Sequence, residues 1–353
     1  MPYLRDTIDA MAGYTPGEQP AEGERVTKLN TNENPYPPSP KVLEVLRESD
    51  WTVLRKYPDP MATKVRRLVA ERFDVLPEQV LCGNGSDELL TLCVRAIVGE
   101  GERVAWPTPT YSLYPVLADI QGAEAVEVPT GIDFTVPIDG LAEVDARLLF
   151  LCNPNAPTGV YTPDTDVLDL ADRFGGVVVV DEAYADFGPG SVIPAVEDRD
   201  NVLVLRTLSK SYSLAGLRFG YAVGPAALIA GLAKCKDSYN CDAVSIEAAA
   251  AALADEEWMR ANVERIRAER SRLSEDLSAL GFGVTPSEAN FLLARPPGGR
   301  ARRLYEGLKS RGILVRYWNL PRLDDKVRIT VGTTEETEAL LSAVADLMEE
   351  EST

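Results

Sequence analysis

Apolar residues along the chain follow two alternating patterns. Stretches with the spacing of an amphipathic helix are separated by short, continuous apolar runs. A continuous run of this length is typical of a strand that is buried on both faces. The expected helices are residues 41–49, 62–73, 87–98 and 164–174, and the expected strands are residues 79–83, 102–110, 147–154, 175–184 and 201–209. This alternation predicts an α/β domain with a mostly parallel sheet flanked by helices.

The two ends of the chain have a different character. The first forty residues are rich in Pro, Gly and Asn, which predicts an extended arm with turns. After Trp258, a long Arg- and Glu-rich helical stretch leads into mixed strand-like and helical segments, which predicts a smaller α+β domain. We therefore expect an N-terminal arm that forms part of the small domain (residues 1–40), a large domain (41–258) and a C-terminal small domain (259–353).

Charge limits the classes of ligand. The 353 residues include 36 Lys and Arg against 55 Asp and Glu, which gives a formal net charge of −19. Nucleic-acid binding needs clustered basic residues, so this balance argues against it. A small anionic substrate remains compatible, because a few local arginines outweigh a distant negative surface.

The sequence contains no histidine, and this absence excludes Ser-His-Asp, Cys-His and His-metal chemistry. We expect no metal site. The five cysteines are odd in number and include no CxxC pair, which favours reduced thiols in a cytoplasmic protein. The N-terminus is polar, unlike a signal peptide, and the apolar runs are too short to span a membrane.

Three polar clusters directly follow predicted strands, at residues 83–88 (GNGSDE), 181–184 (DEAY) and 209–220 (SKSYSLAGLRFG). In open α/β sheets, ligands bind beyond the carboxyl ends of the strands, so the three clusters are expected to share one site. In the first cluster, glycines and Ser86 at a helix start are typical of an anion site, although an ordinary helix start capped by Ser86 or Asp87 has the same pattern. The cluster lacks the third glycine of a dinucleotide motif and the Lys of a P-loop.

The other two clusters carry candidate reactive groups. Asp181 ends a buried strand, where a carboxylate either pairs with a protonated ring nitrogen or caps a turn. Lys210 either reacts with a carbonyl group, if its pKa is lowered, or is a surface lysine. Ser209 and Arg218 flank it and are candidates to clamp a phosphate. Further along, Arg328 lies in an apolar run and needs an anionic partner, either a ligand carboxylate or a structural salt bridge.

Together these motifs resemble the fold-type I aminotransferases that depend on pyridoxal 5'-phosphate (PLP), and within them the histidinol-phosphate aminotransferase family. The resemblance covers nearly the whole chain. The segment SKSYSLAGLRFGY is highly specific for this group, and YPDP, CGNGSDE, NPNAPTG and DEAY occur in the family order. It implies the α/β large domain with a smaller α+β domain, an amino-transfer activity and PLP as cofactor.

The resemblance implies a role for each candidate residue. Lys210 would bind PLP covalently and carry a proton, Asp181 would hold the ring nitrogen protonated, and Tyr184 would contact the ring hydroxyl. Tyr111 would stack on the ring, and Tyr57 would reach a neighbouring site across a dimer interface. The phosphate of PLP would be held by Gly85, Ser86, Asp87, Ser209 and Arg218. One departure is Ala156, where aminotransferases usually have an asparagine that contacts the ring hydroxyl, and either Asn155 or Tyr184 alone would make that contact.

The resemblance also implies a substrate. Arg328 would bind the α-carboxylate of glutamate, and Arg316 would bind the phosphate of histidinol phosphate. The remaining positions that resemble the surroundings of this substrate are Tyr14, Asn34, Tyr239 and Asn240. The implied reaction is transamination between histidinol phosphate and 2-oxoglutarate in histidine biosynthesis, by a homodimer. The alternatives are an aromatic amino-acid aminotransferase of the same subgroup and a threonine-phosphate decarboxylase.

Overall fold

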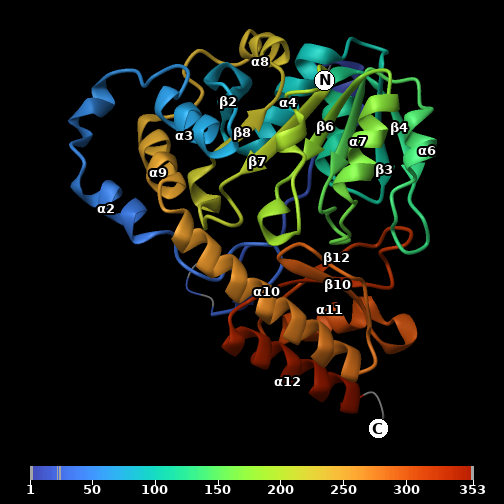
Figure 1. The fold of residues 1–353 in the computed structure, drawn as a ribbon. Coiled ribbons are helices and arrows are strands. Elements are labelled where there is room, and N and C mark those ends of the chain that lie inside the picture. The colour runs from blue at the N-terminus through green and yellow to red at the C-terminus, as the bar shows by residue number, and fades with distance from the viewer. Residues whose placement is uncertain (1–2, 22, 24, 351–353) are drawn as a thin grey trace.

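The central feature of the computed structural model is a seven-stranded sheet in the order β2-β8-β7-β6-β5-β3-β4 (Figure 1). The structure describes residues 3–21, 23 and 25–350, so Met1, Pro2 and the last three residues of the predicted C-terminal domain lie outside it. The strands are β2 (Val80–Gly83), β3 (Arg103–Thr108), β4 (Glu124–Pro129), β5 (Leu148–Cys152), β6 (Val177–Asp181), β7 (Val202–Thr207) and β8 (Gly220–Val223). Among these strands β8 alone runs in the opposite direction to the other six, which confirms the predicted mostly parallel sheet.

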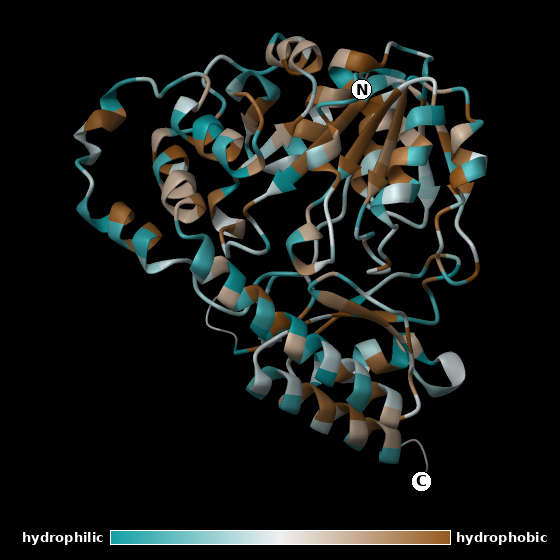
Figure 2. Cartoon of the chain, in the orientation of Figure 1, coloured by the Kyte–Doolittle hydropathy of each residue, from teal (hydrophilic) through white to brown (hydrophobic). Residues whose placement is uncertain are grey.

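The apolar runs form the middle of this sheet. Every residue of β5 and β7 is buried, as is every residue of β6 except Val177. Figure 2 shows these strands as the most hydrophobic part of the molecule, enclosed by helices whose outer faces are polar. The helices of this region are α3 (Thr63–Phe73), α4 (Gly85–Ile97), α5 (Leu113–Gln121), α6 (Ile138–Ala142), α7 (Asp164–Arg173), α8 (Ala226–Ala233) and α9 (Ala243–Leu253). Burial on both faces explains why these strands lack the polar alternation of an exposed sheet.

A smaller layered unit lies below the large sheet in Figure 1. Its antiparallel sheet has the order β12-β13-β10-β9 and is covered by three helices. The strands are β9 (Gly283–Val284), β10 (Phe291–Arg295), β12 (Arg316–Tyr317) and β13 (Val327–Thr330), and the helices are α10 (Glu256–Ala279), α11 (Ala301–Ser310) and α12 (Thr334–Glu350). The apolar run at residues 312–318 is divided between two sheets, because its first half forms β11 (Ile313–Leu314), which pairs with β1 (Thr27–Lys28).

The N-terminal segment touches both layered units. Helix α1 (Asp6–Ala10) packs on α5 of the large sheet, where the Arg5 guanidinium donates to the Ile120 carbonyl over 2.6 Å. Further along, β1 pairs with β11 of the small unit. The chain then enters α2 (Pro40–Glu48), which packs on α9, and the short 3-10 helix η1 (Trp51–Arg55). The residues directly after α1 therefore contact both units, since the Tyr14 ring packs against Tyr111 and the carbonyls of Thr15 and Pro16 accept from Arg316.

Candidate active site

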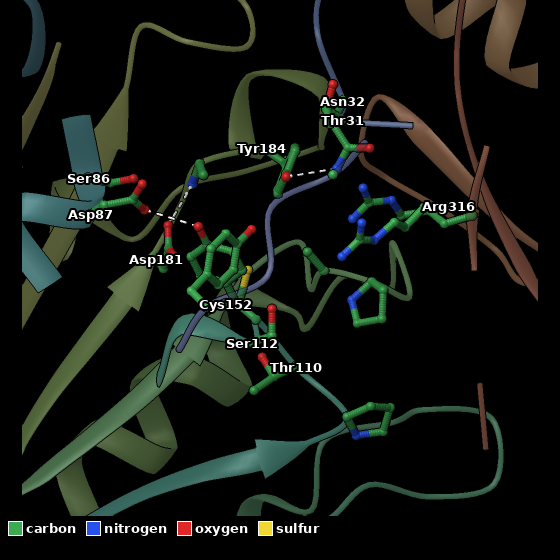
Figure 3. Close-up of a pocket in the computed structure, with 18 of the residues that line it drawn as sticks. Thr31, Asn32, Ser86, Asp87, Thr110, Ser112, Cys152, Asp181, Tyr184 and Arg316 are labelled. Carbon is green, nitrogen blue, oxygen red and sulfur yellow. Dashed lines mark hydrogen bonds between the residues drawn. The ribbon is translucent and has the colours of Figure 1, made fainter. Parts of the chain in front are cut away.

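A cavity of about 310 Å³ opens at the carboxyl ends of β3, β5, β6 and β7. Its walls come from the large sheet, from the N-terminal segment and from β12 and β13 of the small unit. Figure 3 shows Ser86 and Asp87 at one side of the pocket and Arg316 at the other, with Asp181 and Tyr184 between them. The three polar clusters expected from the sequence therefore meet in one place. The predicted site residues that line the cavity are Tyr14, Ser86, Asp87, Tyr111, Asp181, Tyr184, Ser209, Lys210, Arg218, Arg316 and Arg328.

One end of the cavity is built to receive an anion. Helix α4 begins at Gly85 with Asn84 as its N-cap residue, so neither Ser86 nor Asp87 is the helix cap, and the Asn84 side chain makes no capping bond. The Arg218 guanidinium reaches this helix start, where it donates to Ser209 Oγ over 3.3 Å and to Asp87 Oδ2 over 3.2 Å. Free N–H groups, a hydroxyl and a guanidinium at a helix N-terminus together attract a phosphate.

Glycine at position 85 is required by this packing. Its φ of +78° lies in the left-handed region, and a Cβ there would stand 2.9 Å from Arg218 Nη2. Gly220, the first residue of β8, is similarly restricted, because a Cβ there would stand 2.8 Å from the backbone nitrogen of Ser86. Both glycines let the backbone of β8 and the guanidinium of Arg218 approach the start of α4 closely.

Asp181 is the last residue of β6, and its side chain is 2% exposed. Burial raises the pKa of Asp181 to about 6. Two hydrogen bonds act in the opposite direction and lower it: the Tyr114 hydroxyl donates to Oδ2 over 3.1 Å, and the backbone N–H of Ala183 donates to Oδ1 over 3.2 Å. No cation of the described chain forms an ion pair with this carboxylate. An ionised carboxylate in this position is stabilised by a positively charged partner, which a ligand can supply.

Lys210 follows β7 and projects into the cavity rather than into solvent. Its Nζ donates to the carbonyl of Thr31 over 3.2 Å and lies 5.8 Å from the centre of the Tyr184 ring. Burial, together with the positive charge of Arg328, lowers the pKa of Lys210 to about 8. A lysine in this state has an appreciable neutral fraction near neutral pH, which suits reaction with a carbonyl group.

Two tyrosines complete the middle of the cavity. Tyr184 is buried, and its hydroxyl accepts a hydrogen bond from Asn32 Nδ2 over 2.9 Å. The hydroxyl of Tyr111 donates to Asp87 Oδ1 over 3.1 Å, which ties its ring to the anion end of the site. Tyr14, from the N-terminal segment, packs edge-on against the Tyr111 ring with the ring centres 6.2 Å apart.

The opposite wall carries two arginines. Arg328 Nη2 donates to the Asn30 carbonyl over 2.8 Å, and Arg316 donates to the carbonyls of Thr15 and Pro16 over 3.1 and 3.2 Å. In the described part of the chain neither guanidinium has a carboxylate within ion-pair distance, so Arg328 is not the buried structural salt bridge that its sequence context also allowed. Burial lowers the pKa of Arg328 to about 10, and a bound anion would relieve this cost.

The other predicted residues lie outside the cavity walls of the described chain. Asn34 holds the loop after β7, donating to the carbonyls of Lys210 and Ser211 over 3.0 and 3.2 Å. Asn240 donates to the Cys82 carbonyl over 3.2 Å, behind the start of α4. Tyr57 and Tyr239 stack on each other at the surface, with ring centres 4.4 Å apart, and Tyr57 is 80% exposed.

Several residues at the site were not expected from the sequence. Tyr114 lies on α5 one turn after Tyr111, and this spacing in PTYSLY is the signal that could have found it. Asn32 and Thr31 come from the arm, where no periodic pattern distinguishes them from Asn34. Trp318 lines the wall beside both arginines, and no motif of the sequence marks it.

The described residues contain no group of three or more His, Cys, Asp or Glu side chains that could hold a metal ion. Within the same residues, the helices are too short or too polar to cross a membrane.

The chain belongs to the aminotransferase class I and II family, whose model matches residues 24–344. Among its relatives, a histidinol-phosphate aminotransferase 1 from Nostoc sp. is 46% identical over 347 residues, covering 98% of both chains. A histidinol-phosphate aminotransferase from Rhodopirellula baltica is 45% identical over 347 residues, covering 98% of this chain and 96% of the relative.

Solved structures agree with this fold. The structure of histidinol-phosphate aminotransferase from Sinorhizobium meliloti, in complex with pyridoxal-5'-phosphate, matches with a TM-score of 0.91 at 26% identity, covering 99% of this chain and 98% of the other. A variant of Thermus thermophilus aspartate aminotransferase matches with a TM-score of 0.82 at 25% identity, covering 98% and 100%. The predicted family and the fold-type I aminotransferase fold are thereby confirmed.

Proposed function

We propose that this protein is a PLP-dependent aminotransferase that exchanges an amino group between histidinol phosphate and 2-oxoglutarate. One observation carries the proposal. Lys210, Asp181 and the α4 start with Arg218 converge on a single cavity, and each offers what a different part of PLP requires. The names of the relatives at 43–46% identity support the choice of substrate.

The polar groups of the cavity fit the cofactor. Ser86, Ser209, Arg218 and the α4 backbone would hold its phosphate, with Gly85 allowing the close approach. Asp87 would act through its backbone, because its carboxylate already accepts from Arg218 and Tyr111. Asp181 has no cationic partner in the described chain and would pair with the ring nitrogen. When bound, PLP supplies the electron sink that makes a proton on the α-carbon of the substrate acidic.

The protein residues would then divide the remaining work. Lys210, whose pKa is lowered to about 8, would hold the cofactor and afterwards carry a proton to and from the α-carbon of the substrate. Asp181, ionised beside a positive ring nitrogen, would keep that nitrogen protonated. Tyr111 would cover one ring face, held in place by Asp87 and Tyr14.

The contact to the ring hydroxyl falls to Tyr184 in this proposal. The amide of Asn155 is fully engaged within the protein, since it accepts from Thr110 Oγ1 over 2.8 Å and donates to Thr158 Oγ1 over 2.8 Å and to the Pro109 carbonyl over 3.1 Å. In this proposal Asn155 would therefore not take the place of the asparagine that is missing at Ala156. Asn32, which donates to the Tyr184 hydroxyl, supports Tyr184 in this role.

Both substrates carry anions that the arginine wall can bind. The α-carboxylate of glutamate would pair with Arg328, and the phosphate of histidinol phosphate would reach Arg316 on the side of the pocket away from Ser86 (Figure 3). An aromatic amino acid, the substrate in the first alternative, would leave Arg316 without an anion. Two arginines with no carboxylate partner in the described chain therefore favour the phosphorylated substrate.

We also propose that the protein is a cytoplasmic homodimer. Exposed apolar side chains gather on the segment that begins with α2, at the left of Figure 1, and runs to Tyr57, on which Tyr239 stacks. They are Leu43, Val53, Leu54, Tyr57 and Tyr239, each at least 41% exposed. An apolar patch of this kind is typical of a protein–protein interface, and it would carry Tyr57 and Tyr239 to the partner's cavity.

Product analysis tests the proposed reaction. The PLP-loaded protein should convert histidinol phosphate and 2-oxoglutarate to glutamate and imidazole-acetol phosphate in equal amounts, and it should release no CO2 from threonine phosphate. Release of CO2 without any need for 2-oxoglutarate would instead establish the decarboxylase.

Replacing Arg328 with alanine should lower kcat/KM for glutamate by about 100-fold, because the α-carboxylate loses a desolvated, charged partner. The loss for histidinol phosphate, which has no α-carboxylate, should be smaller. Steady-state kinetics of the two half-reactions measure this difference. Equal losses for both substrates would refute the assignment of Arg328 to the α-carboxylate.

Replacing Tyr114 with phenylalanine should weaken PLP binding about tenfold, because Asp181 loses the hydroxyl that stabilises its ionised form. The packing should survive, since the Tyr114 ring stacks on Phe150 with ring centres 4.6 Å apart and the hydroxyl contributes nothing to that stack. Titration of the apoprotein with PLP measures the dissociation constant. An unchanged dissociation constant would mean that Tyr114 has only a packing role.

A further inference from the structure

The two arginines of the substrate wall share one aromatic side chain. Arg316 Cζ lies 5.3 Å from the centre of the Trp318 ring, and Arg328 Cζ lies 5.1 Å from it. A guanidinium at this distance from an indole is attracted by the negative face of the ring. Trp318 is therefore the common neighbour of both cations, which lie on the same wall of the cavity.

Trp318 is itself held from behind. It packs against the apolar cluster of Phe134, Leu293 and Leu323, all three of which are at most 5% exposed. Leu293 belongs to β10, in the middle of the small sheet, so the ring is anchored to a regular element rather than to a mobile loop. An anchored ring fixes the positions of the side chains that stack on it.

The hydrogen bonds of the two arginines go to backbone carbonyls, so within the described chain Trp318 is the one side chain that contacts both guanidinium groups. Arg316 donates only to backbone carbonyls of the N-terminal segment, and Arg328 donates to the Asn30 carbonyl, while its Nε has no hydrogen-bond partner among the described residues. In a chain with 55 acidic residues, no carboxylate of the described part pairs with either guanidinium. The pair is thus held by neutral groups and keeps its full positive charge for a ligand.

We propose that Trp318 is a specificity-determining residue that positions both Arg316 and Arg328 for the anionic groups of the substrates. This inference rests on the proposed function and deepens it. The class of ligand is an amine with a phosphate, or an amino acid with a second carboxylate, rather than an amine with a neutral tail. Trp318 acts through the two arginines and is a positioning residue in the reaction.

The test compares Trp318→Leu with Trp318→Phe and with Trp258→Leu. Trp258 offers the same substitution away from the cavity, where its Nε1 donates to the Pro37 carbonyl. In Trp318→Leu the KM for histidinol phosphate and the inhibition constants of inorganic phosphate and succinate should each rise at least about tenfold, with kcat changed less than about threefold. Trp318→Phe should recover most of this loss, and Trp258→Leu should match the unsubstituted protein.

Histidinol, the same amine without a phosphate, is the control substrate. Its kcat/KM should not fall in Trp318→Leu, so the preference for the phosphorylated amine should shrink about tenfold. Equal losses for histidinol and histidinol phosphate, or unchanged inhibition by phosphate and succinate, would overturn the proposal. If the unsubstituted protein does not use histidinol phosphate, the proposed function fails, and inhibition by the two anions still decides the role of Trp318.

Discussion

Replacing Lys210 with alanine should reduce kcat by about 10,000-fold and abolish the covalent attachment of PLP, while the protein still binds the cofactor non-covalently. Lys210 is the one amine among the residues that line the described cavity, and its lowered pKa suits it both to attach PLP and to transfer a proton. Borohydride reduction followed by mass analysis of the peptides measures the covalent link directly.

The control for this substitution is Lys234→Ala, which removes an exposed lysine at the end of α8. It should keep both the covalent link and the activity. A covalent PLP adduct that persists in Lys210→Ala, on whatever other residue, would contradict the assignment.

Replacing Asp181 with asparagine should have opposite effects on activity and on stability. Activity should fall by about 1,000-fold, because the charge that keeps the ring nitrogen protonated is lost. The apoprotein, in contrast, should become more stable at pH 8, because asparagine removes a buried carboxylate that has no cationic partner in the described chain.

The pH dependence gives the size and the sign of this second effect. The pKa of Asp181 is raised from 3.8 to about 6, so the folded protein binds this proton more tightly than the unfolded chain does. Its contribution to stability is fully present below pH 3.8 and is lost as the pH rises through about 6, at a cost of about 3 kcal/mol. Urea unfolding of both apoproteins should show that gain for Asp181→Asn at pH 8 and no difference near pH 3.5. A gain that is equal at both pH values would contradict a buried, ionised Asp181.

The central strands could be predicted because burial on both faces leaves a local signature. β5, β6 and β7 are continuous apolar runs, whereas β4 is an edge strand with Glu124 and Glu127 in an exposed pattern, and β8 has only four residues. The membership of β4 and β8 in the sheet depends on pairing with strands that are distant in the sequence, and no local pattern reports this pairing.

The site residues likewise divide into those that a local sequence pattern predicts and those that only long-range contacts place. Asp181 ends one strongly patterned strand and Lys210 follows another, so their position at the carboxyl ends of the strands could be inferred. Asn32 and Asn34 lie two residues apart in the arm. Asn32 is the one that reaches Tyr184, and it is held there by long-range hydrogen bonds to Thr330 and Asn290, which no local pattern reports. The location of Tyr57 at the surface likewise follows from tertiary packing rather than from the YPDP motif.

Single-turnover conversion of the PLP form to the pyridoxamine form tests the central claim most directly. Each donor is mixed separately with the loaded protein, and the change in visible absorbance is followed. The donors are histidinol phosphate, glutamate, phenylalanine, tyrosine and threonine phosphate. We expect fast conversion with histidinol phosphate and glutamate and slow conversion with the aromatic amino acids. Fast conversion with phenylalanine or tyrosine, and none with histidinol phosphate, would contradict the proposed function.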